Sequence, residues 1–353
     1  MVRRIVFDAG VSWVARVRLP HIESVFGDRE LLDVASILKV EVASMKFLKA
    51  KTSIPAPEVY SYDAASTNDL GAPYILMDYI HGSVARELRM AKDCDPGMYG
   101  TPNQDRKFRQ QMANVQAELS SFTFDKIGSL YQNEETSEFF IGPELETGKE
   151  PWSSVVNYYA DIADHALHSA ARSIEHPDLQ TGPSFTNPIV FKHLISLYGA
   201  TGAGPFRLTN RDYGAHNLLV NDNFEIVGVI DFDGIMSAPI EVVVQYPALT
   251  GLDREIPGHV ATIPAAIERI ERTKSKLVDY QKLMGAAESA IQSNQGQTPI
   301  ADLLMSDAAS MYQGLLRYRG HQKWVNDQWM EAYMGFLRRY YGHTGMTKTE
   351  HGV

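Results

Sequence analysis

The sequence predicts an α+β protein with two lobes, a small β-rich N-terminal lobe over residues 1–81 and a larger, mainly helical C-terminal lobe over residues 82–353. Three observations predict this. The chain has 353 residues, which is too long for one ordinary hydrophobic core. Hydrophobic residues make up 44% of it, as in packed globular proteins. Strand-like patterns prevail before His81 and Gly82, and helix-like patterns prevail after them.

The beginning of the chain has the pattern of a β-hairpin. Residues 4–7 and 13–17 form two short strand-like runs, and residues 8–10 between them have the chemistry of a turn. Two further strands are expected at residues 59–62 and 73–80. These four strands are the basis for a β-rich first lobe.

Residues 34–51 are expected to form a helix that carries a charged group on its apolar face. The apolar residues that recur at helical spacing are Leu38, Val42, Met45 and Leu48. Glu41 lies on the same face, and a carboxylate among apolar side chains is costly unless it is paired. The pattern therefore indicates that Glu41 needs a partner.

The second lobe has helical patterns at residues 105–121 and 152–200 and again after residue 255, with an aromatic-rich helical stretch at 308–341 before a polar tail. Residues 131–151 are expected to form a loop rich in glutamate. A solvated loop is one interpretation of this acidity, and a cation-binding site is the other. The glutamates concerned are Glu134, Glu135, Glu138, Glu144, Glu146 and Glu150.

Charge and cysteine content exclude several classes of protein. The net charge of -10 argues against nucleic acid as a partner, because a phosphate backbone favours a basic surface. An acidic chain suits a cationic small substrate, although most acidic proteins are merely soluble. The single cysteine, Cys94, cannot form an intrachain disulfide. With no apolar run of about 18 residues or more, we expect a cytoplasmic protein without a membrane partner.

One stretch of the sequence carries a pattern suited to catalysis. Asp212 is followed by Asn217, two apolar runs at residues 218–220 and 226–230 form a predicted hairpin, and Asp231 follows the second run. A hairpin brings the start of its first strand beside the end of its second. We therefore expect Asn217 and Asp231 to be neighbours, with Asp212 over the same end of the hairpin.

These three residue types suit phosphoryl transfer. Oxygen ligands such as those of Asn217 and Asp231 favour Mg²⁺, which is usually held by one or two carboxylates together with substrate phosphates. A further carboxylate, here Asp212, can orient a hydroxyl group and accept its proton. The alternative is that the three residues are only a loop cap, a turn former and a strand-end residue.

The motifs resemble those of the aminoglycoside phosphotransferase and choline kinase group. The sequence N-R-D-Y-G-A-H-N at 210–217 is similar to the catalytic loop of that family, and I-D-F-D at 230–233 is similar to its metal-binding motif. The similarity is greatest to the branch of phosphotransferase-enzyme-family proteins found in filamentous fungi. The resemblance implies a protein-kinase-like fold, ATP and Mg²⁺ as cofactors, and phosphorylation of a hydroxyl group on a small molecule.

The resemblance also implies roles for individual residues. Asp212 matches the catalytic base, with Arg211 beside it. The implied metal ligands are Asn217, Asp231 and Asp233. Glu41 matches a helix glutamate that pairs with a basic residue near the ATP phosphates, and Arg16 stands where that basic residue, usually lysine, is expected; a purely structural ion pair is the alternative. The implied hinge, whose backbone would bond the adenine, is Met77, Asp78, Tyr79 and Ile80.

The sequence departs from the family pattern in places. Asn210 replaces the usual histidine of the catalytic loop, and no segment before Arg16 resembles the first strand or the glycine-rich loop. That difference fits either a truncated gene model or the loss of the loop. It leaves two alternatives to a kinase, a catalytically degenerate nucleotide- or metabolite-binding protein and a fold reused for a reaction without phosphoryl transfer. His216 is interpreted as a packing or hydrogen-bonding residue, with a catalytic role as the alternative.

Overall fold

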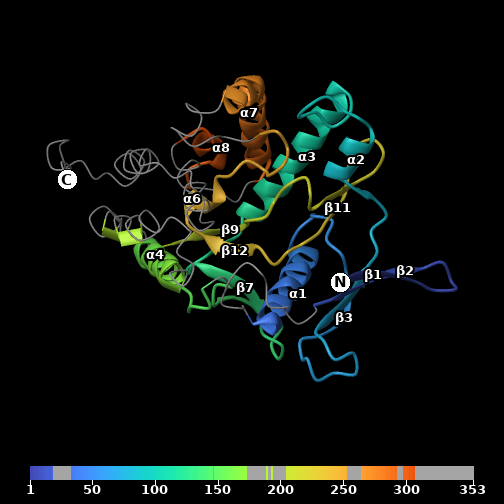
Figure 1. Cartoon of the computed structure of the whole chain (residues 1–353), viewed down its shortest axis with the longest axis vertical. Coiled ribbons are helices and arrows are strands. Elements are labelled where there is room, and N and C mark those ends of the chain that lie inside the picture. Colours follow the sequence, from blue (N-terminus) through green and yellow to red (C-terminus); the bar gives the residue numbers. More distant parts are fainter. Residues whose placement is uncertain are drawn as a thin grey trace.

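The computed structural model describes residues 1–18, 33–145, 147–172, 188–189, 192–193, 204–252, 264–291 and 297–306. The aromatic-rich stretch at 308–341 and the tail after it lie outside these residues, as does most of the segment from 173 to 200. Figure 1 shows the strands of the first lobe at one side of the molecule and helices α3, α7 and α8 at the other.

The first lobe contains a four-stranded sheet with the order β1-β2-β4-β3, in which every pair of neighbours is antiparallel. The strands are β1 (Val2–Val6), β2 (Ser12–Val17), β3 (Val59–Asp63) and β4 (Tyr74–Asp78). The predicted hairpin and the two further strands are therefore confirmed, with the last strand shorter than expected. Trp13 of β2 stacks on Tyr60 of β3 with ring centroids 4.5 Å apart, which supports one face of the sheet.

Helix α1 (Val34–Lys51) confirms the predicted helix. Asp33 caps its first turn by accepting hydrogen bonds from two backbone amides. The apolar face predicted from spacing is buried, and Glu41 is buried with it. Phe47 extends this core away from the first sheet, because its ring packs edge-on against Phe122 and Phe139 with centroids 5.0 and 5.1 Å away.

The second lobe contains more strand than its mainly helical pattern suggests. A five-stranded sheet runs in the order β6-β9-β12-β7-β8. Its strands are β6 (Thr123–Phe124), β7 (Gly128–Gln132), β8 (Phe139–Gly142), β9 (Phe206–Asn210) and β12 (Ile235–Ala238). The prediction of a loop over residues 131–151 is wrong for the end of β7 and for β8, because the aromatic run of β8 pairs with β7 between acidic flanks.

The described helices of the second lobe are α2 (Ala85–Ala91), α3 (Pro102–Ser120), α4 (Val155–Arg172), α6 (Ile240–Val243), α7 (Pro264–Ala290) and α8 (Ile300–Leu303). Helix α3 confirms the predicted helix and begins at a capping box formed by Thr101 and Gln104. It packs against α7 (Figure 1). Of the helices that the structure describes, none is long and apolar enough to cross a membrane.

Two nested ladders hold the segment with the catalytic pattern. Strands β10 (Leu218–Val220) and β11 (Ile226–Val229) pair with each other and form the predicted hairpin, with the short β5 (Ser83–Val84) on the outer side of β10. Strands β9 and β12, which flank this hairpin in the sequence, also pair with each other. The loops that join the two ladders, residues 211–217 and 230–234, therefore face each other.

Candidate functional site

The two facing loops are held together by backbone and asparagine contacts. The Arg211 amide donates to the Gly234 carbonyl at 3.1 Å. The Asn210 side chain accepts from the Asp212 amide at 3.0 Å and donates to the Asp231 carbonyl at 3.4 Å. Asn210 thus bonds both loops. A Cβ atom on Gly234 would lie 2.7 Å from the Asn210 Oδ1 atom, so this close approach requires glycine.

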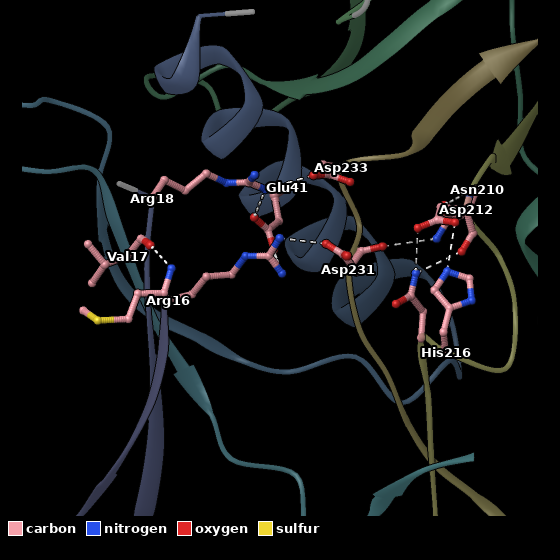
Figure 2. Close-up of polar contacts among 11 residues, drawn as sticks. Arg16, Val17, Arg18, Glu41, Asn210, Asp212, His216, Asp231 and Asp233 are labelled. Carbon is pink, nitrogen blue, oxygen red and sulfur yellow. Dashed lines mark hydrogen bonds and ion pairs between the residues drawn. The ribbon is translucent and has the colours of Figure 1, made fainter. Parts of the chain in front are cut away.

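Asp212, His216 and Asn217 meet within the first loop. The Asn217 side-chain amide donates to the Asp212 carbonyl at 3.0 Å and to its carboxylate at 3.1 Å. The His216 Nε2 atom lies 2.9 Å from the other carboxylate oxygen of Asp212 (Figure 2). The Asp212 side chain is 55% exposed, so it stays open to a substrate. His216 is thus a hydrogen-bonding residue, and its partner is the carboxylate expected to act as the base.

The rear of this loop rests on the segment after α6. Gly214 forms a parallel bridge with Ala248, and a Cβ atom on Gly214 would lie 2.4 Å from the Ala248 carbonyl oxygen. The Tyr213 hydroxyl donates to the Met112 carbonyl of α3 at 3.0 Å, and burial raises the pKa of Tyr213. These contacts fix the loop from behind, while the Asp212 carboxylate stays exposed.

Asp231 lies at the end of the hairpin as predicted. The Ile230 amide donates to the Asn217 carbonyl at 3.0 Å, which continues the β10–β11 ladder to the start of both loops. Asp231 has a φ of 64°, a left-handed conformation that aspartate tolerates better than most residues. The backbone thus bends sharply where β11 ends.

The predicted ion pair between Arg16 and Glu41 is present. One guanidinium nitrogen of Arg16 lies 3.0 Å from Glu41 Oε1, and the other lies 2.7 Å from Asp231 Oδ1 (Figure 2). Arg16 on β2 therefore connects α1 with the segment at residues 230–233, the expected metal-binding motif. The structure brings these residues together, and their role toward phosphate stays a prediction.

Arg18 is a member of this cluster that the sequence reasoning missed. Its guanidinium lies 2.8 Å from Glu41 Oε2 and 3.0 Å from Asp233 Oδ2. Burial works to lower the pKa of Arg18, but the two carboxylates outweigh it and raise the pKa. Burial raises the pKa of Glu41, and Arg16 and Arg18 oppose that shift. Strand periodicity could have indicated Arg18, because residues two apart on a strand share a face and Arg16 was already expected to face Glu41.

Three residues of the facing loops carry donor atoms of the kind found in magnesium sites. Asn217 supplies an amide oxygen and Asp231 and Asp233 supply carboxylates, which are the hard ligands that Mg²⁺ prefers. In the described part of the chain, no group of three or more His, Cys, Asp and Glu side chains is arranged to hold a metal. At nucleotide sites Mg²⁺ is commonly held by one or two carboxylates together with substrate phosphates.

The sequence profile of the phosphotransferase enzyme family matches residues 33–242, which includes both facing loops and Glu41. This is more than half of the chain. The chain belongs to the phosphotransferase enzyme family.

Relatives of this phosphotransferase-family chain match it over limited segments. Altered inheritance of mitochondria protein 9 of Debaryomyces hansenii is 34% identical over 108 residues, which cover 30% of this chain and 16% of that protein. For the protein of the same name in Candida dubliniensis and in Komagataella phaffii, the match spans 15% and 28% of the relative's length.

Two solved structures align with most of the chain. A thermostable mutant of an aminoglycoside phosphotransferase is 13% identical, with a TM-score of 0.42, covering 98% of this chain and 96% of that chain. Macrolide 2'-phosphotransferase type I is 11% identical, with a TM-score of 0.45, covering 95% and 86%. Both scores are low, so the family membership rests on residues 33–242.

The predicted hinge of this phosphotransferase-family chain has side chains engaged in local packing. The Asp78 carboxylate accepts hydrogen bonds from the Glu58 amide and the Tyr60 hydroxyl. The Tyr79 ring lies under the Arg4 guanidinium, with 4.2 Å to the centroid. Ile80 packs on the backbone of Gly228 in β11. The predicted hinge thus joins β4 to the β10–β11 hairpin, and adenine binding by its backbone stays a prediction.

Arg211 is held by a glutamate that the sequence reasoning placed in a solvated or cation-binding loop. The Arg211 guanidinium lies 2.9 Å from Glu144 Oε1, and Glu144 is fully buried. The other glutamates described from that segment, Glu134, Glu135, Glu138 and Glu150, are exposed. The solvated interpretation thus fits these four, whereas Glu144 pairs with the catalytic loop of this phosphotransferase-family chain.

Proposed function

We propose that the protein is an ATP-dependent kinase that transfers a phosphoryl group to a hydroxyl of a small molecule. The observation that carries the proposal is the contact between Asp212 and Asn217 in a loop that is bonded to the loop of Asp231 through the Ile230 amide and the Asn217 carbonyl. Arg16 reaches the Asp231 carboxylate from the first lobe. Membership of a phosphotransferase family supports the same reaction class.

Each residue has a role that follows from its chemistry. Asn217 and Asp231, with Asp233 nearby in the sequence, would hold Mg²⁺, which supplies charge neutralisation at the phosphates. Asp212, half exposed beside them, orients the acceptor hydroxyl and takes its proton. Arg16, fixed by the buried Glu41, binds phosphate oxygens. This is catalysis by positioning and charge, which needs no covalent intermediate.

A second candidate is a protein that binds a nucleotide or metabolite without turning it over. One observation favours it, because Asp231 and Asp233 each form an ion pair with an arginine. In such a protein the aspartates would serve the fold, and Mg²⁺ would add nothing to ligand binding. The two candidates therefore differ in their dependence on the metal.

The test is the thermal unfolding of the purified chain with MgATP and with ATP plus EDTA. A ligand at about 100 times its dissociation constant adds about 2.7 kcal/mol to the free energy of unfolding, which raises the midpoint by a few degrees. A rise with MgATP that EDTA removes is expected. Equal rises in both would favour the second candidate, and no rise with millimolar nucleotide would contradict both.

The companion test is ATP consumption by the Asp212→Asn variant. The substitution keeps the size of the side chain and its place beside His216 and Asn217, so the midpoint shift with MgATP should persist. Turnover should fall by at least about 100-fold, because general-base catalysis contributes roughly that much. Wild-type turnover in this variant would remove Asp212 from the role of base.

A further inference from the structure

Arg18 has a position that the proposed catalytic roles do not use. It directly follows β2, and its backbone amide donates to the Pro73 carbonyl at 2.9 Å, which extends the pairing of β2 beyond Val17. Residues two apart on a strand point to the same face. Arg18 therefore stands beside Arg16 on the side that faces α1 and the metal-binding motif, as Figure 2 shows.

The two arginines make the same kinds of contact. Each guanidinium touches the buried Glu41, and each touches one aspartate of the metal-binding motif, Asp231 for Arg16 and Asp233 for Arg18. Both arginine side chains are mostly buried, with exposed fractions of 19% and 20%. The two cations are thus held in parallel by one shared carboxylate.

Arg18 also carries a donor without a partner. Its Nε atom is buried and makes no hydrogen bond within the described parts of the chain. A buried N–H group without an acceptor is unfavourable, and native structures usually satisfy such groups with protein, water or a ligand. The guanidinium is a planar fork of donors whose geometry matches phosphate oxygens.

The net charge of the cluster changes sign when a divalent cation joins it. The two arginines and the three carboxylates, Glu41, Asp231 and Asp233, sum to one net negative charge. A divalent cation at the two aspartates would leave the same group with one net positive charge. The arginines would then share only Glu41, so the cluster would favour an additional anion.

We propose that Arg18 is a second phosphate-binding residue, which acts with Arg16 as a pair of guanidinium groups that grip the polyphosphate of the nucleotide. In the absence of ligand, Asp231 and Asp233 hold the pair in place. The inference rests on the proposed function. It adds a residue that makes the affinity for a nucleotide depend on how many phosphates the nucleotide carries.

The test is calorimetric titration of the full chain with ATP, ADP and AMP, each in the presence of Mg²⁺. The variants are Arg18→Met, which removes the charge, and Arg18→Lys, which keeps the charge but loses Nε and the fork. Arg3→Met is the matched control, because Arg3 lies on the neighbouring strand β1 and is exposed. It removes one positive charge from the same sheet.

In the wild type and in Arg3→Met, affinity should rise with the number of phosphates. In Arg18→Met, the affinity for ATP should fall by about ten-fold or more while the affinity for AMP changes little, and Arg18→Lys should lie between. Equal losses for ATP and AMP, or no loss, would overturn the role of Arg18. If Arg18→Met does not fold, wild-type affinities in Arg18→Lys overturn it. A wild type that binds none of the three nucleotides contradicts the proposed function itself.

Discussion

Glu144 and Arg211 link the catalytic loop to the turn that follows β8. The Glu144 carboxylate also accepts hydrogen bonds from the backbone and side chain of Thr147, both at 2.9 Å, so its position is set from its own turn. Arg211 immediately precedes Asp212 in the chain. A shift of the Arg211 side chain would therefore move the backbone that carries the proposed base.

We predict that Glu144→Gln lowers ATP turnover by up to about 100-fold with little change in the affinity for MgATP, because a displacement of about 1 Å at a reacting group has effects of that size. The free energy of unfolding should fall by roughly 3 kcal/mol, since a buried charge loses its partner. Turnover and binding, measured separately, check the first part, and urea unfolding checks the second.

Glu138→Gln provides the comparison for this variant, because Glu138 is an exposed glutamate of the same acidic segment. It should leave turnover and stability unchanged. If Glu144→Gln loses stability but keeps wild-type turnover, Glu144 serves the fold alone and does not position Asp212.

Single residues were predictable where their chemistry conflicted with their local pattern. Glu41 interrupts an apolar helical face, and that conflict correctly indicated that it is paired; the family resemblance supplied Arg16 as the partner. Arg18 and Glu144 gave no such signal. Arg18 follows the end of a strand, and Glu144 is one acidic residue among several, so only the tertiary structure distinguishes it as buried.

At the scale of elements, the two loops depend on a close approach at Gly234. A Cβ atom there would meet Asn210 Oδ1 at 2.7 Å and the Asp212 amide nitrogen at 3.2 Å. We predict that Gly234→Ala separates the loops and lowers ATP turnover by at least about ten-fold, with a loss of roughly 1–3 kcal/mol in the free energy of unfolding. Turnover and urea unfolding are the measurements.

The control for that variant is Gly285→Ala in α7. A Cβ atom on Gly285 would make an ordinary contact with Ala301 at 3.5 Å, and alanine favours a helix more than glycine by about 1 kcal/mol. This control should be as stable as the wild type or more so. A Gly234→Ala protein with wild-type turnover would show that the loops do not need their present spacing.

Elements were predictable when their signal was local. The β10–β11 hairpin has two apolar runs around a turn, and α1 and α3 have helical spacing, so all three could be predicted from sequence. The pairing of β9 with β12 could not, because its partners are separated by the whole hairpin and by both loops. Strand β8 was missed because its few aromatic residues lie within acidic flanks.

At the scale of the whole molecule, α1 lies between the two larger sheets. Its Glu41 reaches the arginines of the first sheet, while its Phe47 packs on Phe122 and Phe139 beside and within the second. The hydrophobic core is continuous across the predicted boundary at residue 81. The extent of this shared core was not predictable, because helical spacing shows that a face is buried without showing what covers it.

We predict that Phe47→Ala lowers the free energy of unfolding by about 3–5 kcal/mol, as for other buried phenylalanines. Phe140→Ala is the matched control, because Phe140 lies in the same aromatic region on β8 but is 45% exposed. The Phe140→Ala substitution should lower the free energy of unfolding by clearly less than Phe47→Ala does. Denaturant unfolding of both variants checks this, and equal losses would mean that Phe47 does not join α1 to the second sheet.

The nesting of the two ladders has a consequence for how the molecule folds. The entropy lost on closing a chain segment grows with the length of the segment. Once the short turn between β10 and β11 has closed, half of the chain between β9 and β12 is already fixed, and the outer ladder closes only the two remaining loops. The inner ladder can therefore form before the outer ladder. The loops that carry Asp212 and Asp231 come together only when the outer ladder closes.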